Sequence, residues 1–112
     1  MAKIGTITLT GASGTVYDFN VYPYDTKFNS IGAVYYVSKR TEKKDGTGSH
    51  TKIYIGQSGD LSERFDNHHK ELCFEKKNAN CISIYKVPYE DKRLDIEEDL
   101  IDSYEPPCNG WT

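Results

Sequence analysis

This chain of 112 residues has no long apolar stretch and no closely spaced pair of cysteines. No apolar run approaches the roughly 18 residues of a membrane span, and no basic segment followed by an apolar one opens the chain. We therefore expect no signal peptide, no contact with a membrane and a cytoplasmic protein. Cys73, Cys81 and Cys108 are odd in number and lack CxxC spacing, which argues against both a disulfide framework and a zinc knuckle.

We accordingly expect three reduced, half-buried thiols, with a metal site from Cys73, Cys81 and His69 as the alternative. Several catalytic motifs are missing as well. The stretches GASGTV and DGTGSHTK do not complete a P-loop, QSGD is not a GxSxG elbow, and neither HExxH nor an EF-hand pattern occurs. These absences exclude nucleotide hydrolysis at a P-loop and serine-based acyl transfer.

The chain has a small excess of negative charge, and its charges are unevenly distributed. The net charge is −3, yet residues 39–77 carry nine Lys and Arg against seven Asp and Glu, whereas residues 89–112 carry two against eight. Tight sequence-independent DNA binding needs extensive phosphate neutralisation, which this balance does not supply. Any contact with nucleic acid should be local and should involve the middle of the chain.

The apolar patterning predicts five strands. Residues 1–24 alternate around the turn GASG and predict a hairpin, and Pro23 makes its second strand an edge strand or ends it. Further strands are expected at 31–38, 52–57 and 81–87, with a long polar loop at 39–51. That loop is interpreted either as a solvated hairpin or as a phosphate clamp.

Two helices follow from capping and periodicity. Asp60 with Glu63 three residues later forms a capping box that begins a helix over 60–72, and a final helix is predicted over 90–104. Strands lead and helices follow, which predicts an α+β domain with a small mixed, mainly antiparallel sheet flanked by helices.

Each predicted helix turns ionisable groups toward the sheet. At about 100° per residue, the stripe of Phe65 and Leu72 in the first helix also contains Arg64 and His68. In the last helix the apolar arc that starts at Leu94 has one carboxylate at its centre. The residues of that arc are Ile96, Leu100, Ile101 and Tyr104, with Glu97 in the middle.

A buried carboxylate must be paired, metal-bound or protonated. Arg64 and Glu97 therefore predict either a structural ion pair or a site for phosphoryl chemistry. If the third and fourth strands pair antiparallel, Tyr35 and Tyr54 share one face of the sheet, and Gly56 leaves room for a backbone or a ligand.

Together these elements resemble the GIY-YIG nuclease family over residues 31–109. In chain order they are AVY at 33–35, YIG at 54–56, Arg64, His68, Glu97 in ExxLI, and YEPPCN ending at Asn109. Ala33 stands where the family usually has its first glycine, and Gly32 precedes it. The family module corresponds to residues 31–112, and an N-terminal β-hairpin, residues 1–30, is an addition packed on the same domain.

The resemblance implies hydrolysis of phosphodiester bonds in DNA with Mg²⁺ or Mn²⁺ held at Glu97. It implies that Tyr35 orients the attacking water, with His68 taking the proton. Tyr54 would hold the scissile phosphate, and Arg64 would neutralise developing charge. Substrate contacts are expected from the basic segment and the C-terminal motif, at Lys39, Arg40, Lys52 and Asn109, with Asn109 also bracing the site.

Two other classes of function remain open at this point. One is a catalytically silent module on the same fold that binds a nucleic-acid structure or a protein, and the other is an α+β interaction domain whose polar core is structural. The residues do not decide the target sequence or structure, or whether the substrate is DNA or RNA. They also leave open whether the chain acts as a homodimer or with a DNA-targeting partner protein. Intact Tyr35, Arg64 and Glu97 favour cleavage.

Overall fold

The computed structural model describes residues 3–64 and 70–109, and describes the backbone alone at Glu63 and Arg64. Its elements in chain order are β1 (Gly5–Thr10), β2 (Val16–Pro23), β3 (Ala33–Glu42), β4 (Gly48–Ser58), α1 (Leu61–Arg64), α2 (Glu71–Lys76), β5 (Cys81–Lys86) and α3 (Glu90–Tyr104).

The five strands form one sheet in the order β1-β2-β5-β3-β4, and every described pairing is antiparallel. The predicted α+β class with an antiparallel sheet is therefore confirmed. Because β2 lies between β1 and β5, it is an interior strand, and Pro23 marks its end rather than an exposed edge. The two edges are β1 and β4.

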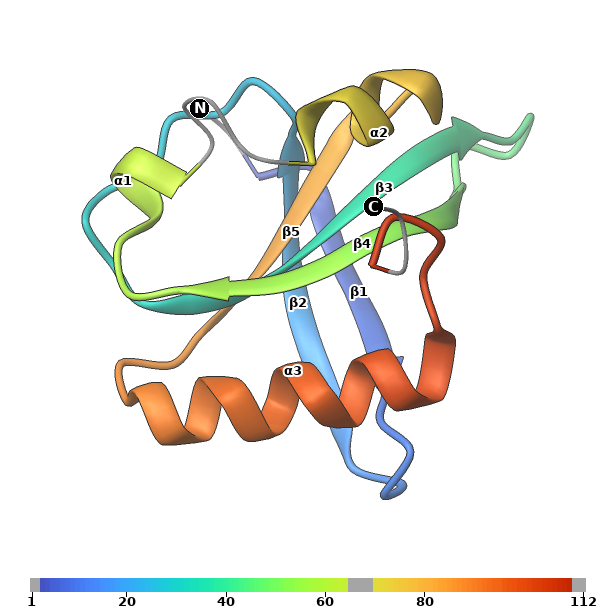
Figure 1. Ribbon diagram of the computed structural model, residues 1–112. Coiled ribbons are helices and arrows are strands. Elements are labelled where there is room, and N and C mark those ends of the chain that lie inside the picture. Colours follow the sequence, from blue (N-terminus) through green and yellow to red (C-terminus); the bar gives the residue numbers. More distant parts are fainter. Residues whose placement is uncertain (1–2, 65–69, 110–112) are drawn as a thin grey trace.

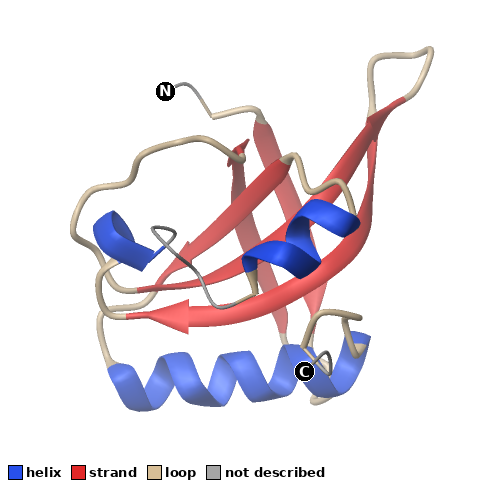
Figure 2. Cartoon of the chain, turned by 45° about the horizontal axis from the view of Figure 1, so that its top comes forward, coloured by secondary structure: helices blue, strands red, loops and turns tan. Residues whose placement is uncertain are grey.

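Helices lie on both sides of a curled sheet (Figures 1 and 2). Helix α3 runs along one face and contacts β4, β3 and β1, while α1 and α2 lie over the other. Each face buries its own apolar cluster. On the α3 side these residues are Leu9, Tyr17, Phe19, Val34, Tyr36, Ile55 and Leu100; the opposite cluster includes Ala33, Tyr35, Val37, Tyr54, Leu61, Phe74, Ile82 and Ile84.

The β1–β2 hairpin is joined to α3 by hydrogen bonds. The Tyr104 hydroxyl accepts from the backbone N–H of Thr10 at 2.8 Å, and Ser103 Oγ donates to the Thr10 carbonyl at 2.7 Å. Asp99 accepts from the hydroxyl of Tyr17 at 2.9 Å and from the amide of Ser13 at 2.8 Å. These contacts fasten the hairpin to the C-terminal half of α3.

The prediction of a long loop over 39–51 is wrong, because β3 and β4 continue through most of this range as a two-stranded ribbon (Figure 2). Residues 43–47 close the ribbon. Asp45 Oδ1 accepts from the amide of Thr47 at 3.0 Å, and Gly46 takes the left-handed backbone angle that this tight turn requires, with φ 87°. Turn chemistry and backbone pairing outweighed the polar composition.

The prediction of one continuous helix over 60–72 is wrong, because Lys70 lies in a turn and α2 begins after it at Glu71. The described part of α1 is Leu61–Arg64, and Phe65, His68 and His69 lie outside the described residues. Leu72 is 65 % exposed, and the buried residues of α2 are Cys73 and Phe74. Across the described chain, no helix combines the length and the apolar character needed to cross a membrane.

Helix α3 has the predicted bounds but presents a different face. Leu94 is 45 % exposed, whereas Arg93 is 5 % exposed. Arg93 and Leu100 are seven residues apart and hence about 20° apart around a helix, so both face the sheet. The packed side therefore runs through Arg93, Ile96 and Leu100 rather than starting at Leu94.

The expectation of three reduced thiols is wrong. Cys73 and Cys108 form a disulfide with a Cα–Cα distance of 5.9 Å, and Cys81 is the free cysteine, buried in β5. The pair is separated by 35 residues, and neither cysteine belongs to a short motif. Spacing rules therefore could not reveal it, because the fold alone brings α2 against the segment that follows α3.

Candidate functional site

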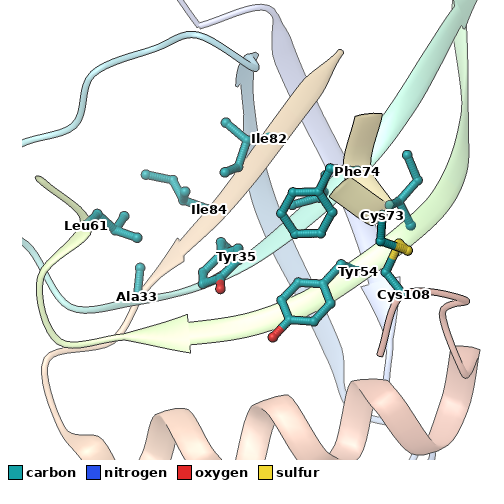
Figure 3. Packing of buried hydrophobic residues seen from close by; sticks show 11 residues of the cluster. Ala33, Tyr35, Tyr54, Leu61, Cys73, Phe74, Ile82, Ile84 and Cys108 are labelled. Carbon is teal, nitrogen blue, oxygen red and sulfur yellow. A yellow bond between two sulfur atoms is a disulfide. The ribbon is translucent and has the colours of Figure 1, made fainter. Parts of the chain in front are cut away.

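Tyr35 on β3 and Tyr54 on β4 lie together on the face of the sheet opposite α3. Their ring centroids are 6.0 Å apart with planes inclined by 37°, which confirms that the two tyrosines share a face. Figure 3 shows both hydroxyl groups turned away from Phe74 and the disulfide. Tyr35 has no exposed surface and Tyr54 is 7 % exposed.

Gly56 explains how the two rings fit. It pairs directly with Tyr35 across the β3–β4 ladder. A Cβ added at Gly56 would lie 2.5 Å from the Tyr35 hydroxyl and 2.7 Å from Tyr54 Cε2. The space above this glycine is thus filled by the Tyr35 ring and not by a backbone or a ligand, which corrects the expectation from sequence.

A second glycine, Gly32, makes room for Arg93. A Cβ on Gly32 would lie 2.7 Å from Arg93 Nη1. The guanidinium donates to the carbonyls of Val87 and Pro88 at 3.0 and 2.9 Å, and its Nε donates to Gln57 Oε1 at 3.0 Å. Arg93 therefore links the start of α3 to β4.

Arg93 was missed by the sequence reasoning. Its seven-residue spacing to Leu100 was a detectable signal that it faces the sheet. The pattern of charges could not show that its guanidinium bonds to two carbonyls and an amide rather than to a carboxylate.

Asn109 braces the strand that carries Tyr54 and Gly56. Its side-chain amide accepts from the backbone N–H of Ile55 at 2.9 Å and donates to the Ile55 carbonyl at 2.8 Å. The neighbouring amide of Cys108 donates to the Ile53 carbonyl at 2.9 Å. The amide of Asn109 is engaged with β4, so it supports the strand and does not point to a substrate.

Glu97 lies on α3 and is half-buried, between the buried Arg93 and Leu100. The expectation that it is the one inward carboxylate of the helix is wrong, because Asp99 is also half-buried and bonds Tyr17 and Ser13. The backbone amide and hydroxyl of Ser13 hold the pKa of Asp99 below its ordinary value. Asp99 serves the β1–β2 hairpin. Glu97 is the carboxylate of α3 to which the family resemblance assigns the metal, and α3 lies on the face of the sheet opposite to the rings of Tyr35 and Tyr54.

The two remaining predicted catalytic groups are not placed. The backbone of Arg64 ends α1, its side chain lies outside the description, and so does all of His68. Asp60 begins α1 as predicted, since its Oδ1 accepts from the amide of Ser62 at 3.0 Å. Leu61 is buried beneath this turn, which holds α1 on the Tyr35 side of the sheet.

A bound metal would depend on few protein ligands. Among the described side chains, no group of three or more His, Cys, Asp or Glu residues is placed to hold an ion. Mg²⁺ commonly uses one or two carboxylates and keeps several waters. One carboxylate at Glu97 with water is compatible with that chemistry, and a multi-ligand cage is not formed by these residues.

The predicted substrate contacts divide between the two faces of the ribbon. Arg40 and Lys52 lie on the α3 side with His50, and Lys39 alternates to the other side. His50 was not singled out from the sequence. Its signal would have been the cross-strand partnership with Arg40, which requires the correct register.

No family model, no curated protein and no solved structure matches this chain.

Proposed function

We propose that this chain is a metal-dependent endonuclease of the GIY-YIG type, hydrolysing phosphodiester bonds in DNA at one active site. The observation that carries the proposal is the paired tyrosines of AVY and YIG, packed on Gly56 on one face of the sheet. Asn109 and Cys108 fix the backbone of the YIG strand from its open edge. This supports a rigid platform for aligned donors, as phosphoryl chemistry requires.

In this proposal each side chain has a separate task. Tyr35 orients the attacking water, Tyr54 donates a hydrogen bond to the scissile phosphate, and Arg64 neutralises charge that develops on the phosphate oxygens. His68 accepts the proton from the water, because a phenol with a pKa near ~10 is a poor base at neutral pH. Glu97 would hold Mg²⁺ or Mn²⁺, which supplies positive charge to the phosphate.

A catalytically silent module that binds nucleic acid or a protein is the second candidate. Its support is the burial of the tyrosines, since Tyr35 has no exposed surface and Tyr54 very little. A catalytic role requires a phosphate to reach these buried hydroxyls, whereas a structural pair of tyrosines needs no access. For the nuclease we propose a cytoplasmic protein that acts on DNA, as a homodimer or with a DNA-targeting partner.

The deciding experiment compares cleavage of labelled single-stranded, duplex, flapped and branched DNA in Mg²⁺ or Mn²⁺. The proteins are the wild type, Glu97→Gln, Arg64→Ala and the matched control Glu98→Gln, which changes an exposed neighbouring carboxylate. We expect Glu97→Gln and Arg64→Ala to lose at least about 10²-fold in rate, and Glu98→Gln to cut like the wild type.

Circular dichroism shows whether each variant is folded. A folded wild type that cuts none of these substrates would overturn the nuclease and favour the silent module. Equal loss in Glu97→Gln and Glu98→Gln would remove Glu97 from the site. If neither activity nor binding changes while Glu97→Gln alters stability, the polar core is structural.

A further inference from the structure

A groove lies on the face of the ribbon opposite the paired tyrosines, between the β1 edge and the outer part of β3 and β4. Two adjoining cavities of about 110 and 240 Å³ form it, and both are lined by Ile7 and His50. Arg40 lines the smaller cavity, and Lys52 lines the larger one. Tyr104 of α3 closes the larger cavity, where its ring lies 4.9 Å from Lys52 Nζ.

The charge of this groove is opposite to that of the chain. Arg40 and Lys52 are its cationic side chains, His50 adds a titratable imidazole, and no carboxylate is among the described residues that line either cavity. The whole protein has a net charge of −3. A local concentration of basic groups without acidic partners is the electrostatic footprint of an anionic ligand.

His50 shows the same imbalance. Burial lowers its pKa first, and the positive charge of Arg40 lowers it further. Its Nδ1 is 2.8 Å from Ser38 Oγ, so Nε2 is the ring nitrogen that this bond does not use, and His50 lines the groove. An anion beside Arg40 and His50 would offset the charge of Arg40 and favour the protonated imidazole.

A β-bulge creates this arrangement. Val37 pairs with Tyr54 but Ser38 pairs with Lys52, so β4 has one extra residue at that point. A one-residue shift moves all later side chains to the other face of a strand. Without the bulge, His50 and Lys52 would share the face of Tyr54; with it, they lie beside Arg40.

The guanidinium of Arg40 packs closely over Gly48, where the absence of a side chain leaves room for it. A Cβ added at Gly48 would lie 2.5 Å from Arg40 Nε and 2.7 Å from Cζ. The backbone of Arg40 is also fixed, because its N–H donates to Asn80 Oδ1 at 2.6 Å and its carbonyl accepts from Asn80 Nδ2 at 3.0 Å. The cation lies flat on the ribbon at the groove wall.

We propose that this groove binds the phosphate backbone of a single nucleic-acid strand. The inference rests on the proposed function, of which it would be the flanking-strand contact. His50 and Lys52 are two residues apart on β4 and hence about 6.6–6.8 Å apart, which suits successive phosphates better than one small anion. The cavities are too small to enclose a duplex. The strand would thus cross the face opposite Tyr35 and Tyr54.

The test is binding of a fluorescent single-stranded oligonucleotide, and of the duplex of the same sequence, measured by anisotropy in EDTA so that nothing is cut. The variants are Arg40→Gln and Lys52→Gln. Lys44→Gln is the charge-matched control, since Lys44 is exposed on the same hairpin and lines neither cavity. Gly48→Ala is a second way to displace the Arg40 guanidinium without removing its charge.

We expect Arg40→Gln and Lys52→Gln each to weaken single-strand binding about 5- to 10-fold and to reduce the salt slope by about 0.7. Lys44→Gln should change affinity less than about 2-fold on the same electrostatic grounds. Equal weakening by Lys44→Gln, or tighter binding of the duplex than of the single strand, would overturn the proposal. Absence of binding by the wild type would do so as well.

The outcome is separable from that of the nuclease proposal. Cleavage that depends on Glu97, together with wild-type binding by Arg40→Gln, Lys52→Gln and Gly48→Ala, would reject the groove and keep the nuclease. Binding that requires Arg40 and Lys52 in a protein that cuts nothing would keep the groove and reject the nuclease.

Discussion

The two halves of the β3–β4 ribbon are built alike and surrounded differently. In the inner half, residues 33–37 and 54–58, Tyr35 packs over Gly56 and Asn109 braces the backbone of Ile55. In the outer half, residues 38–42 and 48–52, Arg40 packs over Gly48, while Asn80 bonds to its backbone. The inner half is buried and aromatic; the outer half is basic and borders a groove.

This comparison shows how one ribbon presents two chemistries on opposite faces. The bulge between the halves places His50 and Lys52 on the α3 side, away from the phenols of Tyr35 and Tyr54. The two halves also differ in how firmly they are held and how exposed they are. The inner half is held by a disulfide-linked segment, and the outer half ends in a hairpin turn, residues 43–47, that is exposed.

The largest effect should follow reduction of Cys73–Cys108, which holds only the inner half. Opening a loop of 35 residues should lower the free energy of unfolding by about 3–4 kcal/mol, mainly through the entropy of the unfolded chain. Urea unfolding with and without a dithiol reductant measures it, with Cys81→Ser as the control for the free thiol. Equal unfolding free energies for the oxidised and reduced proteins would contradict a stabilising role of the disulfide.

Gly56→Ala and Gly48→Ala should differ sharply. The first forces a Cβ against the buried rings of Tyr35 and Tyr54 and should cost about 2–3 kcal/mol of unfolding free energy. The second meets only the end of the Arg40 side chain, which swings away, so its cost should be within about 0.5 kcal/mol. Chemical denaturation of both variants compares them directly. Similar losses would remove the distinction between the halves.

The two asparagine braces should rank in the same order. Asn109→Ala leaves the N–H and carbonyl of buried Ile55 without these partners and should cost about 1–3 kcal/mol. Asn80→Ala exposes its partner groups to water at an exposed position and should cost less than about 1 kcal/mol. Amide hydrogen exchange at Ile55 and Arg40 locates each loss, and a larger loss at Arg40 would reverse the ranking.

The smallest effect is a pH dependence from the outer half. The pKa of His50 is lower in the folded protein than its ordinary 6.5, because of burial and then Arg40. Below about pH 6.5 the unfolded chain binds a proton that the folded chain excludes, so the unfolding free energy falls with falling pH down to the folded pKa. His50→Gln should flatten this part of the profile in urea titrations between about pH 7.5 and 5.5. An unchanged slope would assign the effect elsewhere.

The extent of correct prediction from sequence follows from the range of each interaction. Local patterns predicted the strand alternation, the Asp60 cap and the bounds of α3, because these depend on neighbours within a few residues. The outer ribbon and the hydrogen bond of Arg93 to Gln57 were missed, because each depends on partners distant in the chain. The Cys73–Cys108 pair was missed for the same reason.

Periods of 2 and about 3.6 residues are local properties of the backbone, so the α+β class and the place of Glu97 on the packed side of its helix follow from the sequence. The shared face of Tyr35 and Tyr54, the packing of Tyr35 over Gly56, the bonds from Asn109 to Ile55 and the bulge that brings His50 and Lys52 beside Arg40 required the assembled sheet. Register, bulges and disulfides depend on contacts between segments far apart in the chain, and no local pattern encodes those contacts.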